Sequence, residues 1–174
     1  MQRVAPVNEE IRFRDSEIIV SKTDLKGRIE YANDVFCRVS EMSTAEVVGQ
    51  PHSIIRHPDM PRTVFKYMWE TIQAGSEIFA YVKNMSATGK FYWVIAHVTP
   101  SRDADGNIVG YHSNRRVPSR KGIQDIEPLY KKLLSLELAA SNRKQGLLDG
   151  EAHFHGMLAG LGQTYEQFIW STGE

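Results

Sequence analysis

The chain has 174 residues, which is enough for one domain with an additional segment. Hydrophobic residues make up 41% of it and aromatic residues 10%, so it can bury a core and does not have the composition of a disordered chain. Its 21 Lys and Arg residues balance 21 Asp and Glu residues, and the resulting formal net charge of zero argues against a nucleic-acid-binding protein that works by bulk electrostatics.

The single cysteine excludes an internal disulfide framework and a zinc site built from several cysteines. No apolar run approaches the roughly 18 residues of a membrane span. The N-terminal segment MQRVAPVNEEIRFRD has no apolar stretch of the kind that a secretory signal needs. We therefore expect a cytoplasmic protein.

The pattern of the chain divides it into three parts. Residues 1–15 are polar with mixed charge and are expected to form an N-terminal arm. Residues 16–118 alternate short strand and helix patterns, as in a folded domain. Residues 119–174 have a helical pattern and are expected to form a C-terminal extension.

The domain is predicted to begin with a β-hairpin. A short apolar run at residues 18–20 and a segment of alternating apolar and polar residues at 28–32 flank the turn sequence of residues 24–27. Asn33 or Asp34 can then cap a short helix.

More helices and three strands follow the hairpin. Ser43 and Glu46 form a capping box for another short helix, and a longer helix is expected from about Arg62 to Ala74, where Gly75 ends it. Runs of apolar residues separated by turns predict strands over residues 78–85, 91–100 and 108–115.

This order of elements predicts an α+β fold. Five strands connected mostly by hairpins form an antiparallel sheet, with the short helices grouped on one face. The space between helices and sheet is suited to a small-molecule ligand. The sequence contains no glycine-rich phosphate loop and no supported Ser-His-Asp or Cys-His arrangement, so we do not expect an enzyme.

The C-terminal extension is predicted to contain two helices. The first has apolar positions at helical spacing from Ile126 to Leu134. Gly146 and Gly150 are expected to break the pattern before a second helix that spans residues 154–169. Its apolar face is expected either to dock on its own domain or to form a dimer or partner surface.

Several motifs resemble those of PAS domains, and in particular the FAD-binding PAS sensor of bacterial aerotaxis receptors. The resemblance extends over about residues 16–134 and implies the PAS fold. It also implies a sensor in which the redox state of bound FAD reports oxygen or electron transport to a chemotaxis signalling module. The motifs that carry it are residues 31–36, 49–52, 55–61, 82–84, 92–94 with 98–100, and 127–130.

The resemblance also implies a set of cofactor-binding residues. The amides of this set suit the pyrimidine edge of a flavin, the arginine suits a phosphate, and the phenylalanine can supply a wall. The implied residues are Asn33, His52, Arg56, His57, Asp59, Phe65 and Asn84.

Two positions depart from the family pattern. Ile78 stands where the family has a tryptophan that contacts the flavin, and Phe79 lies beside it. The last strand, residues 111–115, is more polar than usual, which suggests a more polar pocket.

Other interpretations remain open. A haem could be ligated by His52, His57, His97 or His112, and a small metabolite could also fill the pocket. A PAS domain without cofactor could act as a dimerisation module. Cys37 lies too early in the chain for the cysteine motif of light-sensing relatives, and we expect it to be a small buried residue. We expect the chain to form a homodimer or to contact a signalling partner through the N-terminal arm or the C-terminal helices.

Overall fold

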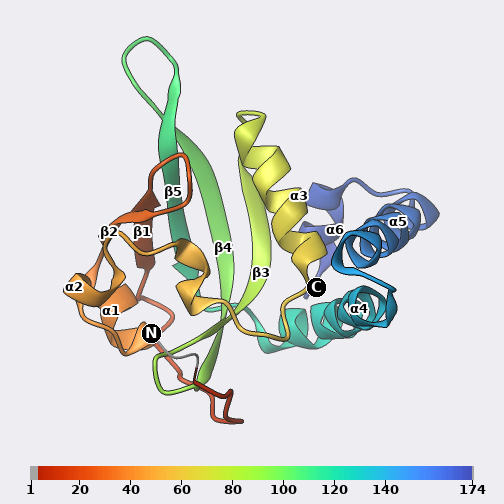
Figure 1. The fold of residues 1–174 in the computed structure, drawn as a ribbon, viewed down its shortest axis with the longest axis horizontal. Coiled ribbons are helices and arrows are strands. Elements are labelled where there is room, and N and C mark those ends of the chain that lie inside the picture. Colours follow the sequence, from red (N-terminus) through yellow and green to blue (C-terminus); the bar gives the residue numbers. More distant parts are fainter. Residues whose placement is uncertain (1–3, 174) are drawn as a thin grey trace. The chain divides into compact units, whose positions relative to one another are not determined.

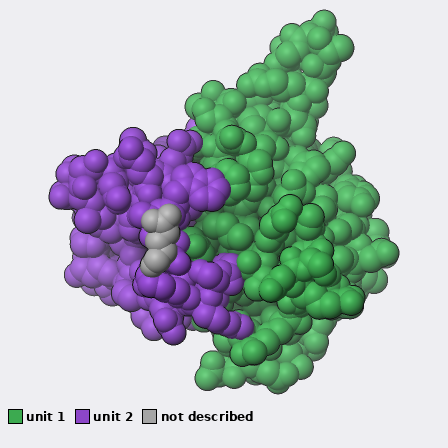
Figure 2. All heavy atoms as spheres, turned by 180° about the vertical axis from the view of Figure 1, so that it is seen from behind, with its two compact units in different colours: residues 1–57, 71–117 green, residues 58–70, 118–174 purple. Residues whose placement is uncertain are grey.

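A computed structural model describes residues 4–173, which form a five-stranded antiparallel sheet, short helices and a helical C-terminal segment (Figure 1). The predicted α+β class is confirmed. Residues 1–3, the start of the expected N-terminal arm, lie outside the described part. The chain divides into two compact units, coloured separately in Figure 2: residues up to 57 with 71–117, and residues 58–70 with those from 118 onward.

The sheet of the first unit has the strand order β2-β1-β5-β4-β3, and every neighbouring pair is antiparallel. The first strand, β1, therefore lies beside the last one, β5, so this pairing joins the two ends of the segment that forms the sheet. The strands are β1 (Ile19–Thr23), β2 (Ile29–Ala32), β3 (Ile78–Met85), β4 (Phe91–Arg102) and β5 (Ile108–Arg116).

Strand register determines which side chains share a face. Arg115 lies opposite Ile19 and Ala96, while Ser113 lies opposite Ser21 and Val98. Because directly opposite residues point to the same side of a sheet, their side chains lie together on what we call the inner face. The buried members of the inner face include Ile19, Ser21, Thr23, Ala32, Ile78, Ala80, Val82, Asn84, Tyr92, Val94, Ala96, Val98, Tyr111, Ser113 and Arg115.

Helix α1 (Asp34–Ser40) is held at both ends by side chains. At its start, Asn33 accepts a hydrogen bond from the N–H of Phe36 and a second one from the N–H of Val20 on β1. At its end, Glu41 adopts a left-handed conformation with φ of 55° and accepts a hydrogen bond from Ser86 at 2.6 Å. The helix is thereby attached to β1 at its start and to the turn after β3 at its end. The short helix α2 (Thr44–Val47) and the 3₁₀ helix η1 (His52–Ile55) follow.

The N-terminal arm pairs with the start of β4. The N–H of Phe91 donates to the carbonyl of Glu9, and the N–H of Ile11 donates to the carbonyl of Phe91. A side chain at Gly89, which has φ of +89°, would collide with the carbonyl oxygen of Ala5. The described part of the arm is therefore a packed segment that requires a glycine in the adjacent turn.

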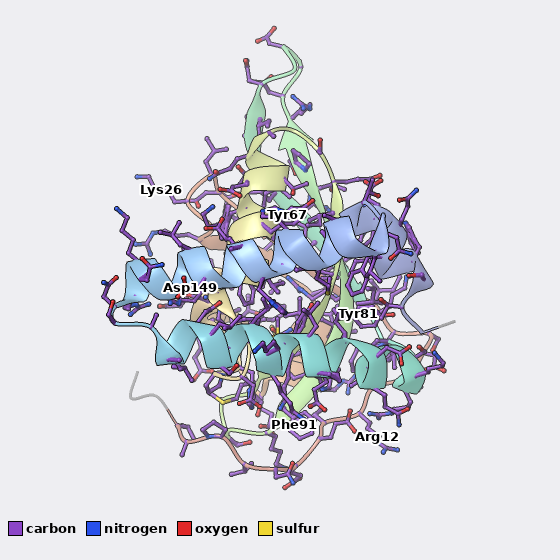
Figure 3. All side chains as sticks on the ribbon, turned by 90° about the vertical axis from the view of Figure 1, so that its right-hand side faces the viewer. Arg12, Lys26, Tyr67, Tyr81, Phe91 and Asp149 are labelled. Carbon is purple, nitrogen blue, oxygen red and sulfur yellow. The ribbon has the colours of Figure 1, made fainter. Side chains whose placement is uncertain are left out.

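The second unit contains the first part of α3 (Arg62–Gln73) and three C-terminal helices: α4 (Arg120–Ala139), α5 (Arg143–Leu161) and α6 (Tyr165–Ser171). Helices α4 and α5 lie side by side (Figures 1 and 3). Tyr67, labelled in Figure 3, packs its ring 5.6 Å from that of Phe154 and 4.7 Å from that of Tyr165. Among residues 4–173, no helix combines the length and apolar character needed to cross a membrane.

The expected helix break at Gly146 and Gly150 is wrong, because both residues lie inside α5. A Cβ at Gly146 would collide with the carbonyl oxygen of Glu137, and one at Gly150 with the hydroxyl of Thr63. These glycines therefore permit close helix packing rather than ending a helix. The expected helix over residues 154–169 is also interrupted, since Gly162 ends α5 with φ of +64°.

Candidate cofactor site

The inner face of the sheet carries several polar groups within an otherwise apolar surface. Asn84 is 3% exposed, Arg115 is 3% exposed and Ser113 is 7% exposed. Among the described residues, Asn84 Nδ2, Ser113 Oγ and Arg115 Nη1 have no hydrogen-bond partner. Buried polar atoms are nearly always hydrogen-bonded in native proteins, so these three atoms are suited to a ligand or ordered water.

Arg115 joins two elements that are far apart in sequence. Its Nη2 donates to the hydroxyl of Ser21 on β1 at 2.6 Å and lies 2.5 Å from Nε2 of His52 on η1. Ser21 Oγ lies 3.2 Å from the same imidazole nitrogen. We define Ser21, His52 and Arg115 as the arginine cluster. Phe36 covers it, with the Arg115 guanidinium 5.6 Å from the ring centroid.

The electrostatics of the cluster determine the protonation state of His52. Burial, followed by the positive charges of Arg115 and Arg56, holds the pKa of His52 well below its usual value. A neutral imidazole can accept a hydrogen bond on Nε2, which agrees with the short distance to the Arg115 guanidinium. His52 is therefore an acceptor in the cluster.

Burial also lowers the pKa of Arg115 to about 10. The guanidinium consequently remains cationic at neutral pH. Tyr92, another buried member of the inner face, has its pKa raised by burial, so its phenol is neutral. Among residues 4–173, no carboxylate forms an ion pair with Arg115.

The structure brings Arg56 and Asn84, two of the predicted site residues, side by side. Their backbones form an isolated antiparallel bridge at the outer edge of β3. The next residue, His57, continues this pairing through its N–H and the carbonyl of Lys83, and its buried ring lies edge-on to Phe91 at 6.4 Å. Arg56 also contributes its charge to the environment of His52.

Asn33 has mainly a structural role in the described structure. Besides accepting the two hydrogen bonds at the start of α1, it donates from Nδ2 to the carbonyl of Ile18 at 2.9 Å. One N–H of its amide is left for any other contact. Its predicted cofactor contact stays a prediction.

The two remaining predicted site residues, Asp59 and Phe65, belong to the second unit. Asp59 is exposed and Phe65 is half-buried. Their predicted cofactor roles also stay predictions.

Sequence reasoning missed four inner-face residues: Ser21, Tyr92, Ser113 and Arg115. The unusual polarity of the last strand was visible, but a strand alternates between two faces. Only its register against β1 and β4 assigns Ser113 and Arg115 to the same side as Asn84 and Tyr92.

The histidines considered for haem separate into two groups. His97 and His112 alternate with inner-face residues and therefore point to the opposite face of the sheet. His97 stacks on Phe79 at 4.1 Å and pairs with Glu77 at 2.6 Å. Of the four candidates, His52 contacts the inner-face residue Arg115. The ring of His57 packs instead against Phe91, which alternates with the inner-face residue Tyr92. No cluster of three or more metal-binding side chains occurs in residues 4–173.

Comparison with known proteins agrees with this architecture. The family model described as "PAS fold" matches residues 29–115, which is half of the chain, and the chain belongs to this family. A solved structure described as "The light state structure of the blue-light photoreceptor Aureochrome1 LOV" matches with a TM-score of 0.54 and 25% identity, covering 70% of this chain and 91% of that one.

Two curated relatives are informative at the sequence level. The chain is 42% identical over 119 residues to the aerotaxis receptor of Escherichia coli K12, covering 68% of this chain and 23% of the receptor. It is 27% identical over 101 residues to the nitrogen fixation regulatory protein of Klebsiella pneumoniae, covering 58% of this chain and 20% of the relative. The chain thus spans less than a quarter of each relative.

Proposed function

We propose that this chain is a flavin-binding PAS sensor that holds FAD. The observation that carries the proposal is the set of three buried polar atoms without partners on the inner face, namely Asn84 Nδ2, Ser113 Oγ and Arg115 Nη1. Amide and guanidinium groups between apolar strand residues suit a flat apolar ring with polar edges. The 42% identity to an aerotaxis receptor supports the same ligand class.

The proposed cofactor contacts combine predicted residues with those that the structure adds. His52, Arg56 and Asn84 lie on or next to the inner face and supply polar contacts. His57 supports the loop that carries Arg56. Asn33, Asp59 and Phe65, which the family resemblance implies, remain members of the proposed set.

The proposed activity is redox or oxygen sensing in aerotaxis-type signal transduction in the cytoplasm, without catalysis. A sensor needs a surface through which its state reaches a partner. The second unit has four exposed large apolar side chains on its C-terminal helices, consistent with a homodimer or a signalling partner. They are Leu138, Leu148, Leu161 and Trp170.

The test is the visible absorption spectrum of the protein purified without added cofactor, followed by acid release and chromatography of the ligand. A yellow protein that releases FAD is the expected result. Asn84→Ala should lower FAD occupancy several-fold, whereas His112→Gln on the opposite face should leave it unchanged. A strong Soret band would move the assignment to haem. A colourless protein that takes up no added FAD or FMN would contradict the proposal.

A further inference from the structure

The positive charge of Arg115 lies inside the first unit without a negative partner. The side chain is 3% exposed, and no carboxylate among residues 4–173 pairs with it. A buried charge is costly unless it is paired and fully hydrogen-bonded. At a pKa of about 10, Arg115 also cannot relieve this cost by losing its proton at neutral pH.

The hydrogen bonds of Arg115 are divided unevenly between its two terminal nitrogens. Nη2 contacts the hydroxyl of Ser21 and the neutral imidazole of His52. Nη1 has no partner among the described residues. The nearest acceptors therefore orient one edge of the planar guanidinium and leave donors on the other nitrogen available.

From these contacts we infer that the arginine cluster, Ser21, His52 and Arg115, is an anion-binding subsite that receives the part of the ligand that becomes negatively charged on reduction. The inference rests on the proposed flavin. The pyrophosphate of FAD is a less suitable occupant, because its two charges would lose hydration in a position enclosed by strands and by Phe36. The isoalloxazine ring has a smaller and delocalised charge.

The subsite influences the charge of the flavin after two-electron reduction. Oxidised flavin that gains two electrons and one proton becomes an anion, and a gain of two protons makes it neutral. In the test, dithionite supplies the electrons and water supplies the protons. A fixed cation beside the ring favours the anion over the neutral form and over the oxidised form. Arg115 is thus a positioning and charge-balancing residue for the reduced ligand.

The experiment is a reductive titration of the flavin-loaded full chain with reference dyes, comparing wild type with Arg115→Gln. Arg116→Gln is the matched control, since it removes the same charge from the next, exposed position of β5. Loss of the subsite should weaken binding of reduced relative to oxidised flavin at least tenfold. For a two-electron couple this is a shift of the midpoint potential by about 30 mV to more negative values. Arg116→Gln should leave the potential unchanged.

The pH dependence of the wild-type potential is a second readout that needs no variant. Uptake of one proton with two electrons gives about 30 mV per pH unit, and uptake of two protons gives about 59 mV. The slope should stay near the lower value between about pH 6 and pH 8, where His52 remains neutral and Arg56, Arg115 and Tyr92 keep their charge states.

Equal potentials in wild type and Arg115→Gln, or a wild-type slope near the higher value, would overturn the subsite while leaving flavin binding intact. If Arg115→Gln does not fold or does not hold flavin, the test rests on the slope of the wild-type potential against pH and on the potential of Arg115→Lys, which keeps the charge. A wild-type protein that binds no flavin would overturn both proposals.

Discussion

The carboxylate of Glu137, near the end of α4, accepts a hydrogen bond from the backbone N–H of Thr63 at 2.9 Å, across 74 residues of sequence. It also accepts from the Thr63 hydroxyl at 2.8 Å and from the N–H of Arg62 at 3.0 Å. The first N–H groups of a helix have no partner within the helix, so a side chain of α4 completes the first turn of α3. The carboxylate is buried, and Arg62 pairs with it at 3.1 Å.

Glu137→Gln should therefore destabilise the protein by about 1–3 kcal/mol, because an amide nitrogen would replace one acceptor oxygen in front of N–H donors. Equilibrium unfolding in urea, followed by far-UV circular dichroism, measures this. Glu127→Gln on the same helix removes an i,i+4 pair with Lys131 and should cost less than about 0.5 kcal/mol. Equal effects of the two substitutions would contradict the role of Glu137.

The glycines of α5 should respond to alanine in opposite directions. Gly146→Ala and Gly150→Ala place a Cβ against Glu137 and Thr63, and we expect each to destabilise by about 1–3 kcal/mol. A Cβ added at Gly156 or Gly160 would meet no neighbouring group within 4 Å, and alanine there should stabilise by up to about 1 kcal/mol through helix propensity. Thermal unfolding of the four variants tests this contrast, and stabilisation at Gly146 would rule out the close packing described here.

Asn33 should matter for stability whether or not it contacts a cofactor. Asn33→Ala removes the cap of α1 and both links to β1, which should cost about 2 kcal/mol or more. Asn33→Asp keeps the acceptor for the N–H groups of Val20 and Phe36 and loses only the donor to Ile18, so it should cost less. Stability of the cofactor-free protein is the measurement. If Asn33→Ala lowers cofactor occupancy without lowering this stability, its main role is ligand contact.

The depressed pKa of His52 makes a signed prediction for acid stability. In the unfolded chain the imidazole takes up a proton near its usual pKa of 6.5, whereas in the folded state it stays neutral to a lower pH. The unfolded state thus binds more protons in this window, and stability should fall as pH drops below about 6.5, by at most about 1.4 kcal/mol per pH unit.

His52→Gln removes this titration and keeps an acceptor for Arg115, so the slope of stability against pH between about pH 5 and 6.5 should decrease. The control is His155→Gln, at an exposed position of α5. Glu41 has its pKa lowered by hydrogen bonds from Ser86 and Thr88, but its effect falls below its usual pKa of 4.5 and so in a separate range. An unchanged slope in His52→Gln would show that other groups control the acid sensitivity.

Local patterns in the sequence predicted the secondary structure of the first unit closely. The hairpin around residues 24–27, the capping box of Ser43 and Glu46 and the three later strands all depend on neighbouring residues, so they can be read from short windows. The helical extension was predicted less well. Gly146 and Gly150 have low helix propensity, and only contacts with Glu137 and Thr63 explain why they lie inside a helix.

The sequence alone therefore determined the order of the elements and the PAS family, because these depend on local periodicity and on short motifs. Its cofactor-binding residues stay predictions. The tertiary structure decided that Arg115 meets His52 and Ser21 and shares a face with Asn84. It also decided that Glu137 completes the first turn of α3. Such relationships depend on strand register and on helix packing between distant segments, which no short window of sequence contains.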